Sequence, residues 1–95
     1  MRLEFSATVW FWRGPSPFHF VTVPDEECGA IEAASSLVTY GWGMIPVTVQ
    51  LGSTTWTTSL FPKDGTYVVP LKALVRRAER IDDGDEVLVV LSVAV

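Results

Sequence analysis

The chain has 95 residues and a formal net charge of −4, from seven basic and eleven acidic side chains. Its length fits a single domain, and 48% hydrophobic against 19% charged residues indicate a globular fold rather than disorder. The negative balance disfavours nucleic acid and anionic membranes as partners. Cys28 is the only cysteine, which excludes an intrachain disulfide and favours a cytoplasmic location. No apolar run approaches the roughly 20 residues of a membrane-spanning helix.

The amino-terminal part of the chain predicts two strands. Residues 3–12 alternate between apolar and polar side chains, which is the pattern of a half-buried strand, and Trp10 and Trp12 share its more polar face. Gly and two prolines make residues 13–17 a loop. Residues 18–23 then form the next strand.

A helix is expected after Pro24, because proline suits a first helical turn. The acidic residues 25–27 favour the positive end of the helix dipole. We expect this helix to end near residue 37, with a narrow apolar stripe of Cys28, Ile31, Ala34 and Leu37.

The remaining residues predict a meander of strands, a second helix and a final strand. The predicted strands of the meander span residues 45–51, 54–62 and 66–70. A two-residue turn at Gly52-Ser53 and a three-residue loop at residues 63–65 connect them. The second helix starts at Leu71, and its apolar stripe consists of Leu71, Leu74, Val75 and Ala78. After a turn at residues 82–85, residues 87–95 are apolar on both faces, which is typical of a central, covered strand.

Two segments follow one plan of strand, proline and helix, namely residues 18–34 and residues 66–79. Such a repeat is typical of a barrel built from two pseudo-equivalent halves. Proline is also common wherever a helix begins, so the repeat has a simpler alternative explanation. We predict one mainly β domain over residues 1–95. Its fold is a six-stranded double-split β-barrel with two short helices, in the order ββαβββαβ, and with a pseudo-twofold internal repeat.

Three segments carry a family resemblance: HFVTVP, GWGMIPVTVQLGSTTWTTSLFP and YVVPLKALVRRAERIDDGDEVLVVL. In this order they resemble an uncharacterised prokaryotic family of small domains of unknown function, over residues 5–93. The resemblance implies a double-split β-barrel capped by helices, found alone or fused to a helical domain linked to bacteriocin protection, which this sequence does not show. The last third also resembles the half-barrel of swapped-hairpin transcription factors and antitoxins. Likeness of fold does not transmit function.

An aromatic set marks the candidate ligand site. Four tryptophans and one histidine are an unusual content for 95 residues. Aromatic side chains with a few polar groups are typical of small-molecule pockets, but tryptophans can also fill the open ends of a small barrel. The candidate ligand-binding residues are Trp10, Trp12, His19, Trp42, Trp56, Phe61, Lys72 and Arg76.

The second predicted helix has a charged flank, because Lys72, Arg76 and Glu79 are spaced by four and three residues. Amide groups after Pro70, together with Lys72, offer an anion site. The alternative is a solvated face with a weak Arg76–Glu79 ion pair.

DNA binding would rely on four basic residues of this region, but five acidic residues lie beside them. Residues 71–86 therefore sum to four minus five, or −1, which is poor for phosphate contacts. The basic residues are Lys72, Arg76, Arg77 and Arg80.

No catalytic or metal-binding constellation is apparent. His19 has no nucleophile beside it in sequence, and one His with one Cys cannot supply the three or four ligands typical of zinc. We expect no enzyme activity, metal or cofactor, and either a monomer or a weak homodimer. The leading hypothesis is a non-enzymatic binding module for a small or anionic ligand or a protein partner. The alternatives are a DNA-binding regulator and a structural domain that docks a protein through its sheet edges.

Overall fold

The structure of the chain is a computed structural model that describes residues 1–14, 18–38 and 44–93, except for the side chains of residues 34–38. These ranges contain seven strands and two helices, which confirms a mainly β fold. The strands are β1 Arg2–Thr8, β2 Trp10–Trp12, β3 Phe18–Thr22, β4 Ile45–Leu51, β5 Thr54–Lys63, β6 Thr66–Leu71 and β7 Glu86–Val93. The helices are α1 Asp25–Val38 and α2 Ala73–Glu79.

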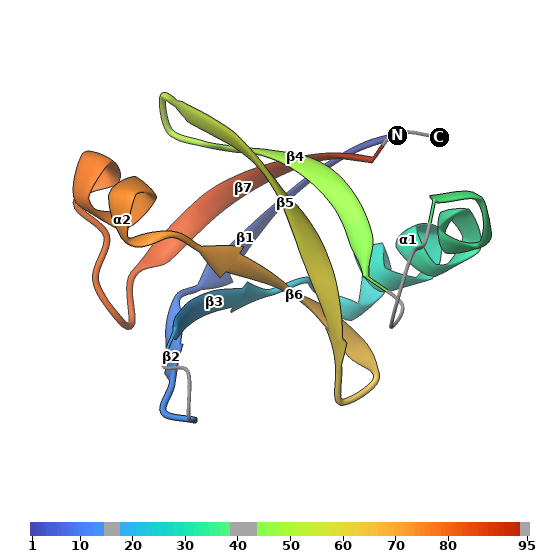
Figure 1. Ribbon diagram of the computed structural model, residues 1–95, viewed down its shortest axis with the longest axis horizontal. Coiled ribbons are helices and arrows are strands. Elements are labelled where there is room, and N and C mark those ends of the chain that lie inside the picture. The colour runs from blue at the N-terminus through green and yellow to red at the C-terminus, as the bar shows by residue number, and fades with distance from the viewer. Residues whose placement is uncertain (15–17, 39–43, 94–95) are drawn as a thin grey trace.

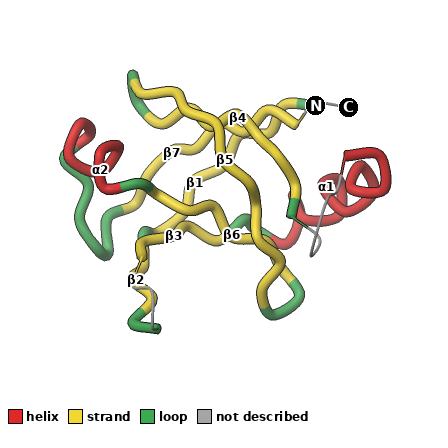
Figure 2. The backbone as a smooth tube through the Cα atoms, viewed as in Figure 1, coloured by secondary structure: helices red, strands yellow, loops and turns green. Residues whose placement is uncertain are grey.

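The strands form one antiparallel sheet in the order β1-β7-β4-β5-β6-β3-β2. The sheet curls into a half-barrel, with α1 and α2 on opposite sides of it (Figure 1). The sheet has two halves, β1-β7-β4 and β6-β3-β2, which β5 connects. β5 belongs to both halves, because residues 54–60 pair with β4 and residues 61–63 pair with β6. Figure 2 follows this long strand across the middle of the sheet. β1 and β2 stand at the two ends of the strand order, so the described ladders do not close the barrel that the sequence predicts.

The prediction of six strands is wrong by one, because the strand expected over residues 3–12 breaks at Val9. There the backbone N–H of Val9 donates to the carbonyl oxygen of Asp85, and the carbonyl oxygen of Val9 accepts from the N–H of Gly84, both at 2.8 Å. Before this point β1 pairs with β7, and after it β2 pairs with β3. Val9 is 1% exposed, as an inward residue of an unbroken strand would be, so alternation alone does not reveal the break.

The turn between β4 and β5 has the predicted form. Leu51 pairs with Thr54, which leaves the two-residue loop Gly52-Ser53. Gly52 has a φ of 61°, and glycine at the first loop position suits a type II′ hairpin turn.

The loop between β5 and β6 is shorter than the predicted three residues 63–65. Lys63 pairs with Thr66, so Asp64 and Gly65 alone form the loop. Both have positive φ, 51° and 79°, as a type I′ Asp-Gly turn requires.

α1 begins directly after Pro24, as predicted. The carbonyl oxygen of Pro24 accepts a hydrogen bond from the backbone N–H of Cys28 at 3.1 Å, and the acidic residues 25–27 occupy the first turn. Cys28 and Ile31 are buried in the core. Two further members of the expected stripe have side chains outside the described part, namely Ala34 and Leu37.

α2 begins two residues later than predicted, because β6 continues to Leu71 and the helix starts at Ala73. The predicted apolar stripe is correct for Leu71 and Val75, which are buried, and wrong for its other two members. Val75 is the buried residue of α2, whereas Leu74 is 70% exposed and Ala78 is exposed as well.

The core lies on the inner face of the curled sheet. Val89, Leu91 and Val93 of β7 point into it with 2% exposure or less. β7 is central, between β1 and β4, as predicted. The prediction that both its faces are covered is wrong, because Leu88 on the other face is 53% exposed.

The pairing order has the symmetry that the repeat predicts. If the β1–β2 segment is counted as one strand, exchanging β3 with β6, β4 with β7, and the β1–β2 segment with β5 gives the same set of paired strands. The prolines, however, are not equivalent. Pro70 lies within β6, where it pairs with Phe20, whereas Pro24 lies after the end of β3 and directly before α1. The expectation that both helices follow directly after a proline is wrong for α2.

The two faces of β7 predict opposite responses to truncation. We expect Leu91→Ala to lower the free energy of unfolding by about 2–5 kcal/mol, because it leaves a cavity in a packed core. Leu88→Ala, on the same strand, should change it by less than about 0.5 kcal/mol. Urea denaturation followed by circular dichroism measures both, and equal losses would contradict the assignment of the inner face.

Candidate functional site

β3 and β6 carry apolar side chains on both of their faces. Val21 and Val69 point into the core and are 0% exposed. Their neighbours Phe20 and Val68 point to the opposite, outer face, because successive side chains of a strand alternate. Phe20 and Val68 are nevertheless only 9% and 3% exposed, so they are covered by other side chains of that outer face.

These outer side chains line a groove of about 530 Å³, which we call the aromatic groove. Residues of β2, β3, β5 and β6 contribute to it. Trp12 and Phe61 are 42% and 39% exposed, so the groove presents aromatic surface to solvent. Its apolar lining consists mainly of Trp12, Phe18, Phe20, Phe61, Val68 and Pro70.

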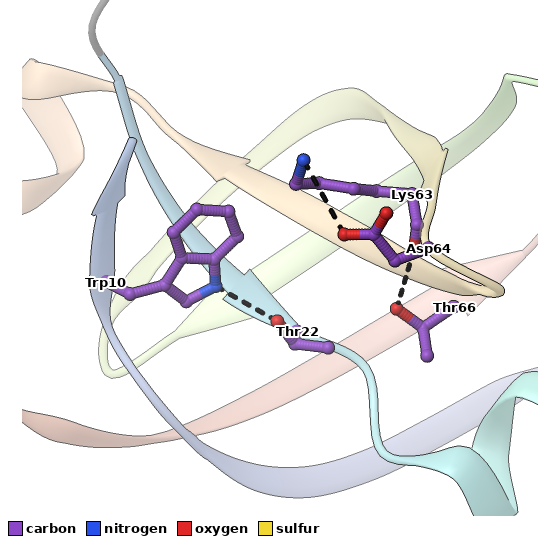
Figure 3. Close-up of polar contacts among 5 residues, drawn as sticks. All are labelled: Trp10, Thr22, Lys63, Asp64 and Thr66. Atoms are coloured by element: carbon purple, nitrogen blue, oxygen red, sulfur yellow. Dashed lines mark hydrogen bonds and ion pairs between the residues drawn. The ribbon is translucent and has the colours of Figure 1, made fainter. Parts of the chain in front are cut away.

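Two lysines also line the aromatic groove, and none of its described lining residues is acidic. The Nζ of Lys63 lies 5.7 Å from the centroid of the Trp12 ring. It also lies 3.7 Å from a carboxylate oxygen of Asp64, as Figure 3 shows for this pair. Lys72 has no ion pair within the described ranges. The groove therefore combines an apolar floor with positive charge, one lysine being partly neutralised and the other free to meet an anion.

Trp10 supports the aromatic groove without lining it. Its indole Nε1–H donates to the hydroxyl oxygen of Thr22 at 3.0 Å (Figure 3), and its ring lies 5.2 Å from that of Phe20. This satisfied indole fixes one wall of the groove, because Phe20 in turn contacts the rings of Trp12 and Phe18. The contacts are tilted, as aromatic pairs prefer.

The structure thus brings three of the predicted site residues together, namely Trp12, Phe61 and Lys72. Sequence reasoning missed all seven of the other described lining residues. The signal that could have found them is the consecutive apolar residues of two strands, which require a cover on both faces. The missed residues are Phe18, Phe20, Thr58, Pro62, Lys63, Val68 and Pro70.

His19 lies away from the aromatic groove, on the inner side of β3. It pairs with Leu71, and its ring lies 4.7 Å from that of Phe11. Burial lowers the pKa of His19 below its ordinary value, the charge of Arg76 lowers it further, and Asp83 and Asp82 oppose the shift.

Trp56 and Arg76 also lie outside the aromatic groove. Trp56 pairs with Val49 and packs against the core. Its indole Nε1 and the Nε of Arg76 are buried without a hydrogen-bond partner among the described residues. Trp42, the remaining member of the predicted set, lies outside the described residues.

A second groove of about 570 Å³ adjoins the aromatic groove, and we call it the hydroxyl groove. It lies on the outer face of β4 and β5 and reaches β7. Thr48 pairs with Thr57 on one side and with Ser92 on the other, which sets three hydroxyl-bearing side chains in a row. Thr58, Phe61 and Lys72 line both grooves.

The predicted anion site at the start of the second helix is not supported. Pro70 lies inside β6, and α2 is a short helix of seven residues whose N-cap, Lys72, makes no capping hydrogen bond through its side chain. The expected Arg76–Glu79 ion pair is absent from the described contacts. Glu79 instead accepts hydrogen bonds from the hydroxyls of Thr54 at 2.6 Å and Ser53 at 3.3 Å, which ties α2 to the β4–β5 turn.

No group of three or more His, Cys, Asp or Glu side chains is placed to hold a metal ion within residues 1–14, 18–38 and 44–93. Neither α1 nor α2 has the length and apolar character needed to cross a membrane.

Comparison with known proteins gives a family without an activity. The profile of the family described as "Domain of unknown function (DUF1905)" matches residues 5–91. No curated protein matches the chain.

The pKa shift of His19 predicts how stability depends on pH. Because folding disfavours the protonated form, the free energy of unfolding should fall as the pH drops below the ordinary value of 6.5. His19→Phe keeps a ring against Phe11 and removes the titrating group, so it should flatten this dependence down to about pH 5, where carboxylates begin to titrate. Urea denaturation at several pH values measures the slope. An unchanged slope in the variant would contradict the assignment.

Proposed function

Because the chain belongs to the DUF1905 family of domains of unknown function, we propose a function from the geometry of the aromatic groove. The domain is a non-enzymatic binding module, and the groove takes a small apolar molecule that carries negative charge. The observation that carries the proposal is the exposed pair Trp12 and Phe61 above an apolar floor, with Lys63 and Lys72 beside it.

The apolar surface of the groove supports ligand binding. Ligand sites are typically concave and apolar, with a few polar groups that orient the ligand. The aromatic groove has that composition, and its volume of about 530 Å³ suits a small molecule. Rings that are already fixed against one another, as Phe20 is by Trp10, lose little freedom when a ligand binds.

The charge of the groove supports an anionic ligand. The chain as a whole carries −4, yet the described residues that line its aromatic groove include two lysines and no acidic side chain. An anion therefore gains from Lys72 without repulsion inside the groove, and the apolar surroundings strengthen that attraction relative to bulk water.

A binding module is also favoured over an enzyme because no histidine is among the described residues that line the aromatic groove. A general base next to a nucleophile is the usual signature of covalent catalysis. His19, the single histidine, lies on the inner side of β3 against Phe11, whereas the groove is on the outer side.

Docking of a protein partner is the second candidate. β2 is a short strand at one end of the strand order and has a described neighbour, β3, on one side only. Its exposed Trp12 lies beside that edge. An extended peptide could add to β2 as a further strand and place a side chain in the groove.

DNA binding is a weaker candidate than either of these, because the basic residues of the α2 region lie beside acidic ones. Arg77 and Arg80 of the α2 region are exposed, but so are Asp82, Asp83 and Asp85, which follow directly. We expect the protein to pass freely through a DNA column at low salt. Retention that falls as salt rises would instead favour the DNA-binding alternative.

Naphthalene-2-carboxylate is a suitable probe for the groove, because it joins a flat apolar ring to a carboxylate. We expect Trp12→Ala to weaken its binding about tenfold or more, since truncating a central aromatic anchor removes much of the contact area. Lys72→Met should also weaken it, whereas neutral 2-naphthol should not respond to that change. Titration followed by NMR chemical shifts measures these affinities.

Leu74→Ala is the matched control, because it removes an exposed apolar side chain outside the groove. It should leave the affinity unchanged. No shift of groove resonances with naphthalene-2-carboxylate would reject the proposed ligand class, and an equal loss in both alanine variants would reject the site.

A further inference from the structure

The aromatic groove does not end at Phe61 and Lys72, because both residues also line the hydroxyl groove. We infer that the two grooves hold one extended small ligand with three parts: a flat apolar group, a negatively charged linker at Lys72, and a polar group that forms hydrogen bonds. This inference rests on the proposed function and names the ligand class more closely.

The two grooves share a wall and differ in chemistry. Thr58, Phe61 and Lys72 line both, so a molecule can pass from one groove to the other along the same side chains. The part near β2 and β3 presents aromatic rings. The part over β4 and β5 presents hydroxyls, which donate and accept hydrogen bonds but offer little to an apolar group.

The hydroxyl groove is open to a ligand. Thr48, Thr57 and Ser92 are neighbours across three strands and are exposed. None of these three hydroxyls has a hydrogen-bond partner among the described residues. A row of free hydroxyls matches a ligand that carries several hydroxyls or carbonyls of its own.

The position of Lys72 fixes where the negative charge of the ligand belongs. Neither groove has an acidic side chain among the described residues that line it. Lys63 lies at the aromatic end beside the carboxylate of Asp64, whereas Lys72 lies at the junction without an ion-pair partner in the described ranges. The charge complementarity therefore places an anionic group between the apolar part and the polar part of the ligand.

Two phosphodiesters test this arrangement. The glycerol ester of 1-naphthyl phosphate carries a naphthyl ring, one negative charge and two hydroxyls in that order. Its matched control, 1-naphthyl propyl phosphate, lacks only the hydroxyls. We expect the glycerol ester to bind about tenfold more tightly, the effect of one or two added hydrogen bonds, as measured by isothermal titration calorimetry.

The double variant Thr48→Val and Thr57→Val removes two hydroxyls while keeping the branched shape that a strand favours. It should erase the difference between the two phosphodiesters and leave the affinity for naphthalene-2-carboxylate unchanged. Lys72→Met should weaken both phosphodiesters by a similar factor, because both place their charge at the junction.

The possible results separate the inference from the proposed function. Equal affinities of the two phosphodiesters overturn the inference, and binding of naphthalene-2-carboxylate then still supports the aromatic groove. A preference for the glycerol ester that survives in the double variant also overturns the inference, because the hydroxyls would be bound elsewhere. If neither phosphodiester nor naphthalene-2-carboxylate binds, the proposed function itself fails.

Discussion

The curled sheet depends on two places where an extended segment, without an intervening helix, passes from one half of the sheet to the other. In β5 the passage follows Leu60, whose side chain is 0% exposed, and the ladder changes there from β4 to β6. In the β1–β2 segment the passage is Val9, which the turn before β7 holds through two backbone hydrogen bonds. At both places an extended segment pairs with one half before the passage and with the other half after it. The curl, the enclosed core and the position of the grooves all follow from these two passages.

The same arrangement explains why the apolar surface is not fully enclosed. α1 contacts β4 and β6, and α2 contacts β5, on opposite sides of the sheet (Figure 1). The outer face of β2, β3 and β6 is left to cover itself, which Trp10, Trp12 and Phe20 do in part through tilted ring contacts. Such self-covering buries Phe20 but leaves Trp12 and Phe61 partly exposed. The aromatic groove thus results from a strand pattern that is apolar on both faces and from helices that lie elsewhere.

Much of this fold could be predicted from local signals. The Gly52-Ser53 turn, the helix after Pro24 and the central place of β7 follow from turn chemistry, capping and apolar content. The break at Val9 could not, because its hydrogen bonds to residues 84 and 85 come from the far end of the chain. For the candidate site, the aromatic set identified Trp12 and Phe61. It could not separate them from His19, since the face to which each strand residue points depends on the pairing of distant strands.

The misplaced start of α2 shows how a shift of two residues changes the chemistry of a site. Because β6 runs on to Leu71, residues 68, 70 and 72 alternate on its outer face while Val69 and Leu71 enter the core. A helix starting at Leu71 would have placed Lys72 on a helical flank with Arg76. As an extended residue Lys72 instead lies beside Phe61, where both grooves meet. β6 can tolerate Pro70 because the β5 ladder ends at Val68, so no described partner on that side requires its missing N–H. The proline expected to start a helix is therefore a strand residue of β6, and it lines the aromatic groove.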